Sequence, residues 1–162
     1  MHLIKMRQTI TYLLVSLLAI SCENPLDKQT DVPGDLIDTT LDLFDGEIIE
    51  KKADKLDDVD VWKIKIENNS GAVTSFYWRK SYFNLFRIVG EQGPFDYNLK
   101  PPLDVINFNT AKFLAFNQNT HDDLTSWKFM RSPGEVRWFY KFYLNDDGST
   151  ITVDAGSGEI VR

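Results

Sequence analysis

The alternation of apolar and polar residues is clearest in the last third of the chain. Between Val136 and Leu144 every second residue is apolar, and Ile151 and Val153 resume the alternation after the turn-forming residues 145–148. A period of two residues is typical of a strand with one buried face, and a polar break containing glycine between two such runs is typical of a hairpin. The pattern therefore predicts a β-hairpin, followed by a tight bend and a short extended piece ending near residue 161.

The first half of the chain shows a helical period followed by strand periods. Ile37, Leu41 and Phe44 recur at helical spacing within residues 35–45, and Gly46 is expected to end that helix. Residues 47–52 fit a last helical turn or a first strand equally well. Strands are predicted in the regions 62–66, 72–79 and 82–89, from alternating or aromatic-rich runs separated by turn-forming residues.

The second half repeats this plan after a boundary at residues 101–102, which are both proline. Asn109 or Thr110 is predicted to cap a short helix, and a strand around residues 127–130 leads into the hairpin. The inner stripe of that helix is predicted to be Ala111, Leu114 and Ala115. We therefore predict an α+β fold of two αβββ-type repeats, residues 35–100 and 101–162, forming a largely antiparallel sheet with the helices packed on one face.

The start of the chain predicts export. Lys5 and Arg7 precede an apolar run over residues 10–20 that ends at Ser21 and Cys22, which is the pattern of a secretory signal. Residues 18–22 resemble a bacterial lipobox, which implies that residues 1–21 are removed and that Cys22 carries a lipid. Residues 22–34 are then a flexible tether in the cell envelope of a Gram-negative-type bacterium. The alternative is a membrane anchor helix with a chance cysteine, but the run is short for a span.

The composition argues against several classes of partner and catalytic site. The net charge of -6 and the lack of a basic run argue against nucleic acid as a partner. The mature chain would hold His121 as its single histidine, in a polar loop, and Ser157 lies outside any nucleophile-elbow pattern. We therefore predict no catalytic residue, no metal site and no cofactor.

The second half is similar to a PepSY domain. The likeness rests on Ala111 in the helix, Trp127 in the first strand, residues 138–140 (Trp-Phe-Tyr) in the second, and the closing segment 152–160, Thr-Val-Asp-Ala-Gly-Ser-Gly-Glu-Ile. The first half resembles a more divergent copy, with Trp62 and the segments 69–72 and 93–97 at comparable places.

Tandem PepSY-like units resemble the β-lactamase-inhibitor-protein type of fold. The resemblance implies a non-catalytic binding or inhibitory module, such as an inhibitor or regulator of an exported peptidase, rather than an enzyme. The expected partner is a protein or peptide of the envelope, with the membrane contacted through the lipid on Cys22.

The outward side of the main hairpin is the predicted contact surface. If Trp138, Tyr140 and Phe142 point inward, the residues that point out are Arg137, Phe139, Lys141 and Tyr143, and Tyr77 and Arg79 extend the surface if the sheet is continuous. The competing interpretation is that the helices cover this face and its aromatic residues are core. The alternative function is a small-molecule or glycan binder, which would require a concave pocket between the repeats.

Overall fold

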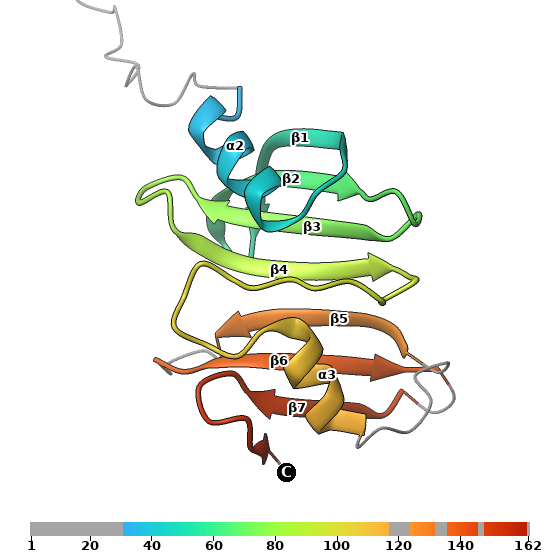
Figure 1. Cartoon of the computed structure of the whole chain (residues 1–162). Coiled ribbons are helices and arrows are strands. Elements are labelled where there is room, and N and C mark those ends of the chain that lie inside the picture. The colour runs from blue at the N-terminus through green and yellow to red at the C-terminus, as the bar shows by residue number, and fades with distance from the viewer. Residues whose placement is uncertain (1–30, 117–123, 132–135, 146–147, 162) are drawn as a thin grey trace, which may run out of the picture.

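The computed structural model describes residues 31–116, 124–131, 136–145 and 148–161. Within these residues, two helices and eight strands form an α+β fold, in which one antiparallel sheet has its strands in chain order (Figure 1). The predicted fold class and antiparallel sheet are thus confirmed. The elements are α2 (Gly34–Leu43), β1 (Glu47–Leu56), β2 (Val59–Glu67), β3 (Val73–Arg79), β4 (Leu85–Gln92), α3 (Phe108–Phe116), β5 (Leu124–Arg131), β6 (Trp138–Leu144), β7 (Thr150–Asp154) and β8 (Ile160–Val161).

Several sequence predictions fall outside the described residues. These are the signal sequence, Cys22 and most of the tether, the loop that contains His121, and the central residues of the hairpin turn. In the part of the chain that is described, no helix combines the length and apolar character needed to cross a membrane.

The core lies on one face of the sheet. Because directly paired residues of neighbouring strands point to the same side, a single row of side chains runs across six strands from β2 to β7. All members of this row are fully buried. They are Ile64, Phe76, Ile88, Phe129, Tyr140 and Val153.

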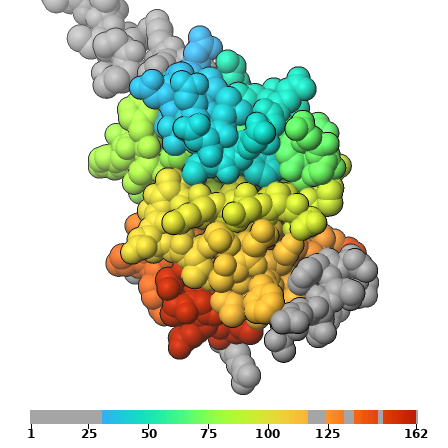
Figure 2. Space-filling view, in the orientation of Figure 1, coloured from blue at the N-terminus to red at the C-terminus, as the bar shows by residue number. Residues whose placement is uncertain are grey.

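Both helices cover this same face. The Trp78 indole in β3 donates a hydrogen bond from Nε1 to Thr40 Oγ1 of α2 (3.1 Å), and the Phe108 ring of α3 lies 4.4 Å from that of Trp127 in β5. Figure 2 shows α2, the connection that follows β4 and α3 together filling this side of the molecule. The prediction that the helices share one face is therefore correct.

The main hairpin is confirmed in both pairing and orientation. In β6 and β7, Phe142 pairs with Ile151 and Tyr140 pairs with Val153, as the alternating pattern required. Trp138, Tyr140 and Phe142 all belong to the core.

Each helix is followed by four strands, whereas about three were predicted. The additional strand of the first half is β1, whose ten residues run from Glu47 to Leu56 at the edge of the sheet and are all exposed or only partly buried. An edge strand has only one neighbour and can keep charged residues on both sides, which hides the period of two. In the second half the fourth strand is the two-residue β8, which confirms the short extended piece predicted to end near residue 161.

Helix α3 also differs from its prediction. It is capped by Asn107, whose Oδ1 accepts a hydrogen bond from the Thr110 backbone N–H (2.8 Å), and not by Asn109 or Thr110. The cap shifts the helix start to Phe108, so Phe108 and Ala111 are its buried residues. Leu114, predicted to face inward, is 36% exposed.

Candidate binding face and arginine-lined pocket

The sheet face opposite the helices, here called the open face, carries a second row of paired residues. Lys63, Tyr77, Arg87, Met130 and Phe139 lie side by side from β2 to β6. Each alternates with a core residue of the same strand, so these side chains point away from α2 and α3. Neither described helix packs on the open face.

Phe139 lies on the predicted side of β6, but its ring is covered. It is only 6% exposed, and the Arg137 guanidinium carbon lies 5.5 Å from the ring centroid. Arg137 Nη1 is also 3.4 Å from Asp154 Oδ2. Hydrogen bonds from the backbone N–H groups of Ser157 and Gly156, aided by Arg137, hold the pKa of Asp154 below its usual value. At this place Arg137 is therefore the exposed side chain that a partner could contact, and the buried Phe139 ring packs beneath it.

Lys141 and Tyr143 form a second contact on the open face. Two ammonium groups approach the Tyr143 ring, with Lys128 Nζ 5.0 Å and Lys141 Nζ 5.5 Å from its centroid. Ammonium groups are attracted to the electron-rich face of an aromatic ring. Neither lysine has a carboxylate partner among the residues that the structure describes. The open face of the second half is therefore cationic.

The open face of the first half is instead internally neutralised. Glu50 Oε1 and Oε2 lie 2.7 Å from Lys52 Nζ and 2.6 Å from Lys63 Nζ. The hydrogen bonds from Lys52 and Lys63 lower the pKa of Glu50 from 4.5 to about 2. Glu91 similarly accepts hydrogen bonds from Lys65 (2.5 Å) and Ser75 (2.5 Å).

Tyr77 and Arg79 lie on the open face in β3, separated from β6 by two strands. Tyr77 is half-buried, and this burial raises the pKa of its hydroxyl. Arg79 turns toward the end of the sheet, where its guanidinium carbon lies 5.0 Å from the centroid of the Phe86 ring. The structure thus places the six predicted contact residues in two separate groups on one face.

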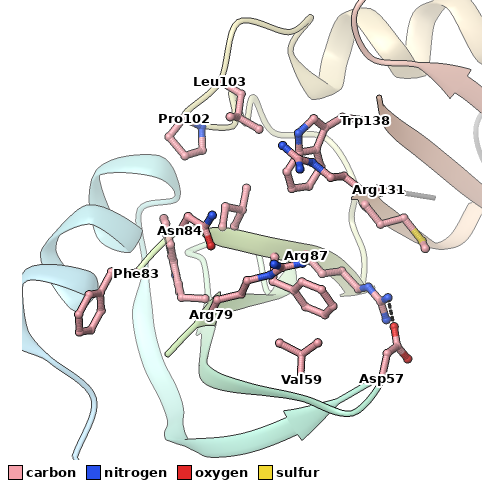
Figure 3. Close-up of a pocket in the computed structure, with 14 residues that line it drawn as sticks. Asp57, Val59, Arg79, Phe83, Asn84, Arg87, Pro102, Leu103, Arg131 and Trp138 are labelled. Carbon is pink, nitrogen blue, oxygen red and sulfur yellow. Dashed lines mark hydrogen bonds and ion pairs between the residues drawn. The ribbon is translucent and has the colours of Figure 1, made fainter. Parts of the chain in front are cut away.

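A pocket of about 680 Å³ lies at the end of the sheet where the two halves meet (Figure 3). β3 and β4 provide one wall, β5 and β6 another, and the connection around Pro102 and Leu103 closes a side. We call it the arginine pocket. Its lining residues are Asp57, Val59, Trp78, Arg79, Phe83, Asn84, Leu85, Phe86, Arg87, Pro102, Leu103, Met130, Arg131 and Trp138.

Three guanidinium groups are held in this pocket by aromatic rings. Arg79 and Arg87 both contact Phe86, with guanidinium carbons 5.0 Å and 5.4 Å from its ring centroid, and Arg131 lies 4.9 Å from Trp138. Among the described lining residues, Asp57 is the one carboxylate, and it pairs with Arg87. The lining therefore carries an excess of positive charge, although the whole chain is acidic.

Local backbone geometry positions the charged pair. Asp57 and Asp58 form the two-residue turn between β1 and β2 and have φ angles of 50° and 63°, a conformation that aspartate tolerates in such hairpins. This turn brings Asp57 to Arg87, two strands away in the sheet. Phe86 lies at an irregularity of pairing between β3 and β4, where one extra residue is accommodated in β4.

Sequence reasoning missed Arg87 and Arg131 as site residues. They lie far apart in the chain, on β4 and β5, and their meeting depends on the pairing that places Arg87 opposite Met130. Nothing local in the sequence marks that pairing. Arg79, in contrast, was predicted as a site residue, although for the open face.

The chemistry available at both places is binding by charge and aromatic contact. No group of three or more His, Cys, Asp or Glu side chains that could hold a metal ion occurs in the described ranges. The arginine pocket offers guanidinium and Asn84 amide donors beside apolar walls. Such a lining suits an anionic group attached to an apolar one.

No family model matches the sequence, and no curated protein matches it. A solved structure described as a "putative lipoprotein" from Clostridium difficile 630 is similar over 86% of this chain and 97% of its own, with 18% identity and a TM-score of 0.36. A likeness at this level supports neither a fold nor a function for this chain.

Proposed function

We propose that the chain is a lipid-anchored, non-catalytic module of the cell envelope that holds a protein or peptide on its open face. The observation that carries the proposal is the position of both helices on the other side of an eight-stranded sheet. The open face then presents aromatic residues beside cations, such as Tyr143 next to Lys128 and Lys141. Aromatic and arginine side chains are enriched where proteins meet.

Charge makes the proposed partner more specific. On the open face of the first half, Glu50 and Glu91 engage Lys52, Lys63 and Lys65. Lys128 and Lys141 of the second half have no carboxylate partner in the described part of the chain. A partner segment rich in Asp or Glu would be attracted to the second half and oriented there. We therefore propose an acidic, extended segment as the ligand of the open face.

The duplication and the PepSY-like resemblance belong to the same proposal. A helix followed by four strands occurs twice in the chain order, which supports two related units spanning residues 35–100 and 101–162. Inhibition or regulation of an exported peptidase is the narrower function that the resemblance implies. This peptidase-directed function is supported by the PepSY-like resemblance and by the open face alone.

The experiment is a binding selection with displayed peptides of varied charge. We expect the purified chain to select acidic peptides, and we expect the variants Tyr143→Ala and Lys141→Gln each to weaken their binding about fivefold or more. Tyr82→Ala is the matched control, because Tyr82 is 74% exposed in the turn between β3 and β4 and is absent from the open-face row. Phe139→Ala is unsuitable, because removing a buried ring would also destabilise the fold.

Two results would overturn the proposal. One is selection of peptides without regard to their charge. The other is unchanged affinity of the selected peptides for both open-face variants.

A second candidate function is small-molecule binding at the junction of the halves. The observation that favours it is the arginine pocket, because a binder of this class requires a concave site between the two units. This candidate uses different residues from the open-face contact around Tyr143, so the two can be tested separately.

A further inference from the structure

The arginine pocket has more guanidinium groups than carboxylates among its described residues, which indicates an anionic ligand. Arg79 and Arg87 both contact the Phe86 ring, so two positive charges lie in the same part of the pocket. Asp57 compensates Arg87, but Arg79 has no carboxylate partner among the described residues. Arg87 is further fixed by burial, with 12% of its side chain exposed and its Nε lacking an acceptor within the described structure. An anion in the pocket would supply the negative partner that Arg79 lacks among the described residues.

The remaining lining is largely apolar. Leu85 is buried, and Leu103, Met130 and Trp138 come from three other segments that face the same space. If a small inorganic ion were the ligand, these apolar side chains would stay in contact with water. A ligand that joins an anionic head to an apolar body would use both parts of the lining.

The size and rigidity of the site fit such a ligand. A volume of about 680 Å³ lies within the range of about 300–1,000 Å³ that is typical of small-molecule sites. Arg79 and Arg131 are already stacked on Phe86 and Trp138, so less side-chain freedom is lost when they bind.

We propose that the arginine pocket binds a small amphiphilic oxyanion, in which a carboxylate or phosphate is contacted by Arg79 and Arg131 and an apolar body lies against Trp138, Leu85 and Leu103. The inference rests on the second candidate function and names its ligand class. It does not depend on the open-face proposal.

The test is isothermal titration of the full chain with four probes. Octanoate and octyl phosphate carry both features, octanol lacks the charge, and inorganic phosphate lacks the apolar body. We expect one or both of the first two probes to bind at least about tenfold more tightly than octanol and inorganic phosphate. The ratio between octanoate and octyl phosphate then shows which oxyanion the pocket prefers.

Variants locate the binding. Arg79→Gln and Arg131→Gln are each expected to weaken the charged probe about tenfold or more, because each removes charged hydrogen bonds. Lys128→Gln removes the same charge from the open face outside the pocket and is expected to change the affinity less than twofold. Circular dichroism establishes that each variant is folded, and two independent arginines keep the test decisive if one variant is not.

Each contrary outcome has its own meaning. Equal binding of octanol and octanoate would overturn the oxyanion inference while leaving a neutral small-molecule site. Inorganic phosphate binding as tightly as octanoate and octyl phosphate would also overturn it. So would a loss of affinity in Lys128→Gln as large as in the arginine variants, because either result would mean that general charge attraction explains the binding. Failure of all four probes to bind would overturn both the inference and the second candidate function.

Discussion

The indole of Trp127 lies directly over Gly90 of the neighbouring strand. A Cβ atom added at residue 90 would be 2.0 Å from Trp127 Nε1, and these two residues are paired in the register of β4 and β5. Trp127 is fully buried and donates a hydrogen bond from Nε1 to the Tyr97 hydroxyl (2.8 Å). The two halves of the sheet are therefore joined at a place where one strand has no side chain and the other has the largest one.

Gly90→Ala should destabilise the protein strongly. The added methyl group would displace a buried indole and break its hydrogen bond to Tyr97, so we expect a loss of at least about 2 kcal/mol in the free energy of unfolding. Urea denaturation followed by tryptophan fluorescence measures the change. Gly34→Ala is the matched control, since no atom lies within 4 Å of the Cβ it would add, and it should cost almost nothing. Equal stabilities of the two variants would contradict the close approach.

Thr40→Val should destabilise the contact between α2 and the sheet. Thr40 is fully buried and its Oγ1 accepts a hydrogen bond from Trp78 Nε1, so valine would leave a buried indole N–H without an acceptor. We expect a loss of about 1–3 kcal/mol, measured by urea denaturation. Thr39→Val removes a hydroxyl from the adjacent, exposed position and should cost less than about 0.5 kcal/mol. A comparable loss in both variants would show that the Trp78 contact is unimportant.

The period of two in the sequence correctly predicted the strands whose core-facing residues are all apolar. Trp138, Tyr140 and Phe142 lie on one side of β6, and the structure places all three in the core as expected. Phe139 on the other side is also buried, which the period of two did not predict. β1 could not be assigned in the same way, because charged residues occupy both sides of an edge strand. The cap of α3 was misplaced because Asn107 and Asn109 are equally good capping residues, and only the packing of Phe108 distinguishes them.

The arginine pocket could not be predicted from local patterns at all. In the sequence, Arg87 and Arg131 are indistinguishable from ordinary charged residues in or beside a strand, and Arg79 was predicted only for the open face. Their convergence depends on long-range pairing of β3, β4 and β5 and on the extra residue near Phe86 in β4. Sequence periodicity determines which side of a strand is buried, but it does not determine which distant residues become neighbours.

Cys22→Ser should release the protein from the membrane fraction. The lipobox-like residues 18–22 predict that a lipid on Cys22 provides the anchor, and serine lacks the thiol that is modified. We expect the wild-type chain to incorporate radiolabelled palmitate and to sediment with membranes, and the variant to do neither. Ser21→Ala keeps the small residue before the cysteine and serves as the control. Membrane retention of Cys22→Ser without label would contradict lipid anchoring.

Glu50→Gln should lower stability at neutral pH and lose its effect in acid. The folded-state pKa of Glu50, about 2, lies below its usual value of 4.5, because Lys52 and Lys63 stabilise the ionised carboxylate. Its contribution is therefore fully present above pH 4.5 and is lost as the pH falls toward 2. Solvent screens this pair, since 34% of the Glu50 side chain is exposed, so we expect a difference of only about 0.5–1 kcal/mol at pH 7.

Urea denaturation of wild type and Glu50→Gln at pH 7, 4.5 and 2.5 measures how this difference changes with pH. Glu67→Gln is the control, because Glu67 is exposed and has no ion pair among the described residues, so its difference from wild type should stay near zero throughout. Half-molar sodium chloride at pH 7 should also reduce the Glu50 difference, as expected for a partly exposed charge network. A difference for Glu50→Gln that stays constant from pH 7 to 2.5 would show that the ion pairs with Lys52 and Lys63 contribute no net stability. The open face of the first half would then lack the neutralised charge network that sets it apart from the cationic second half.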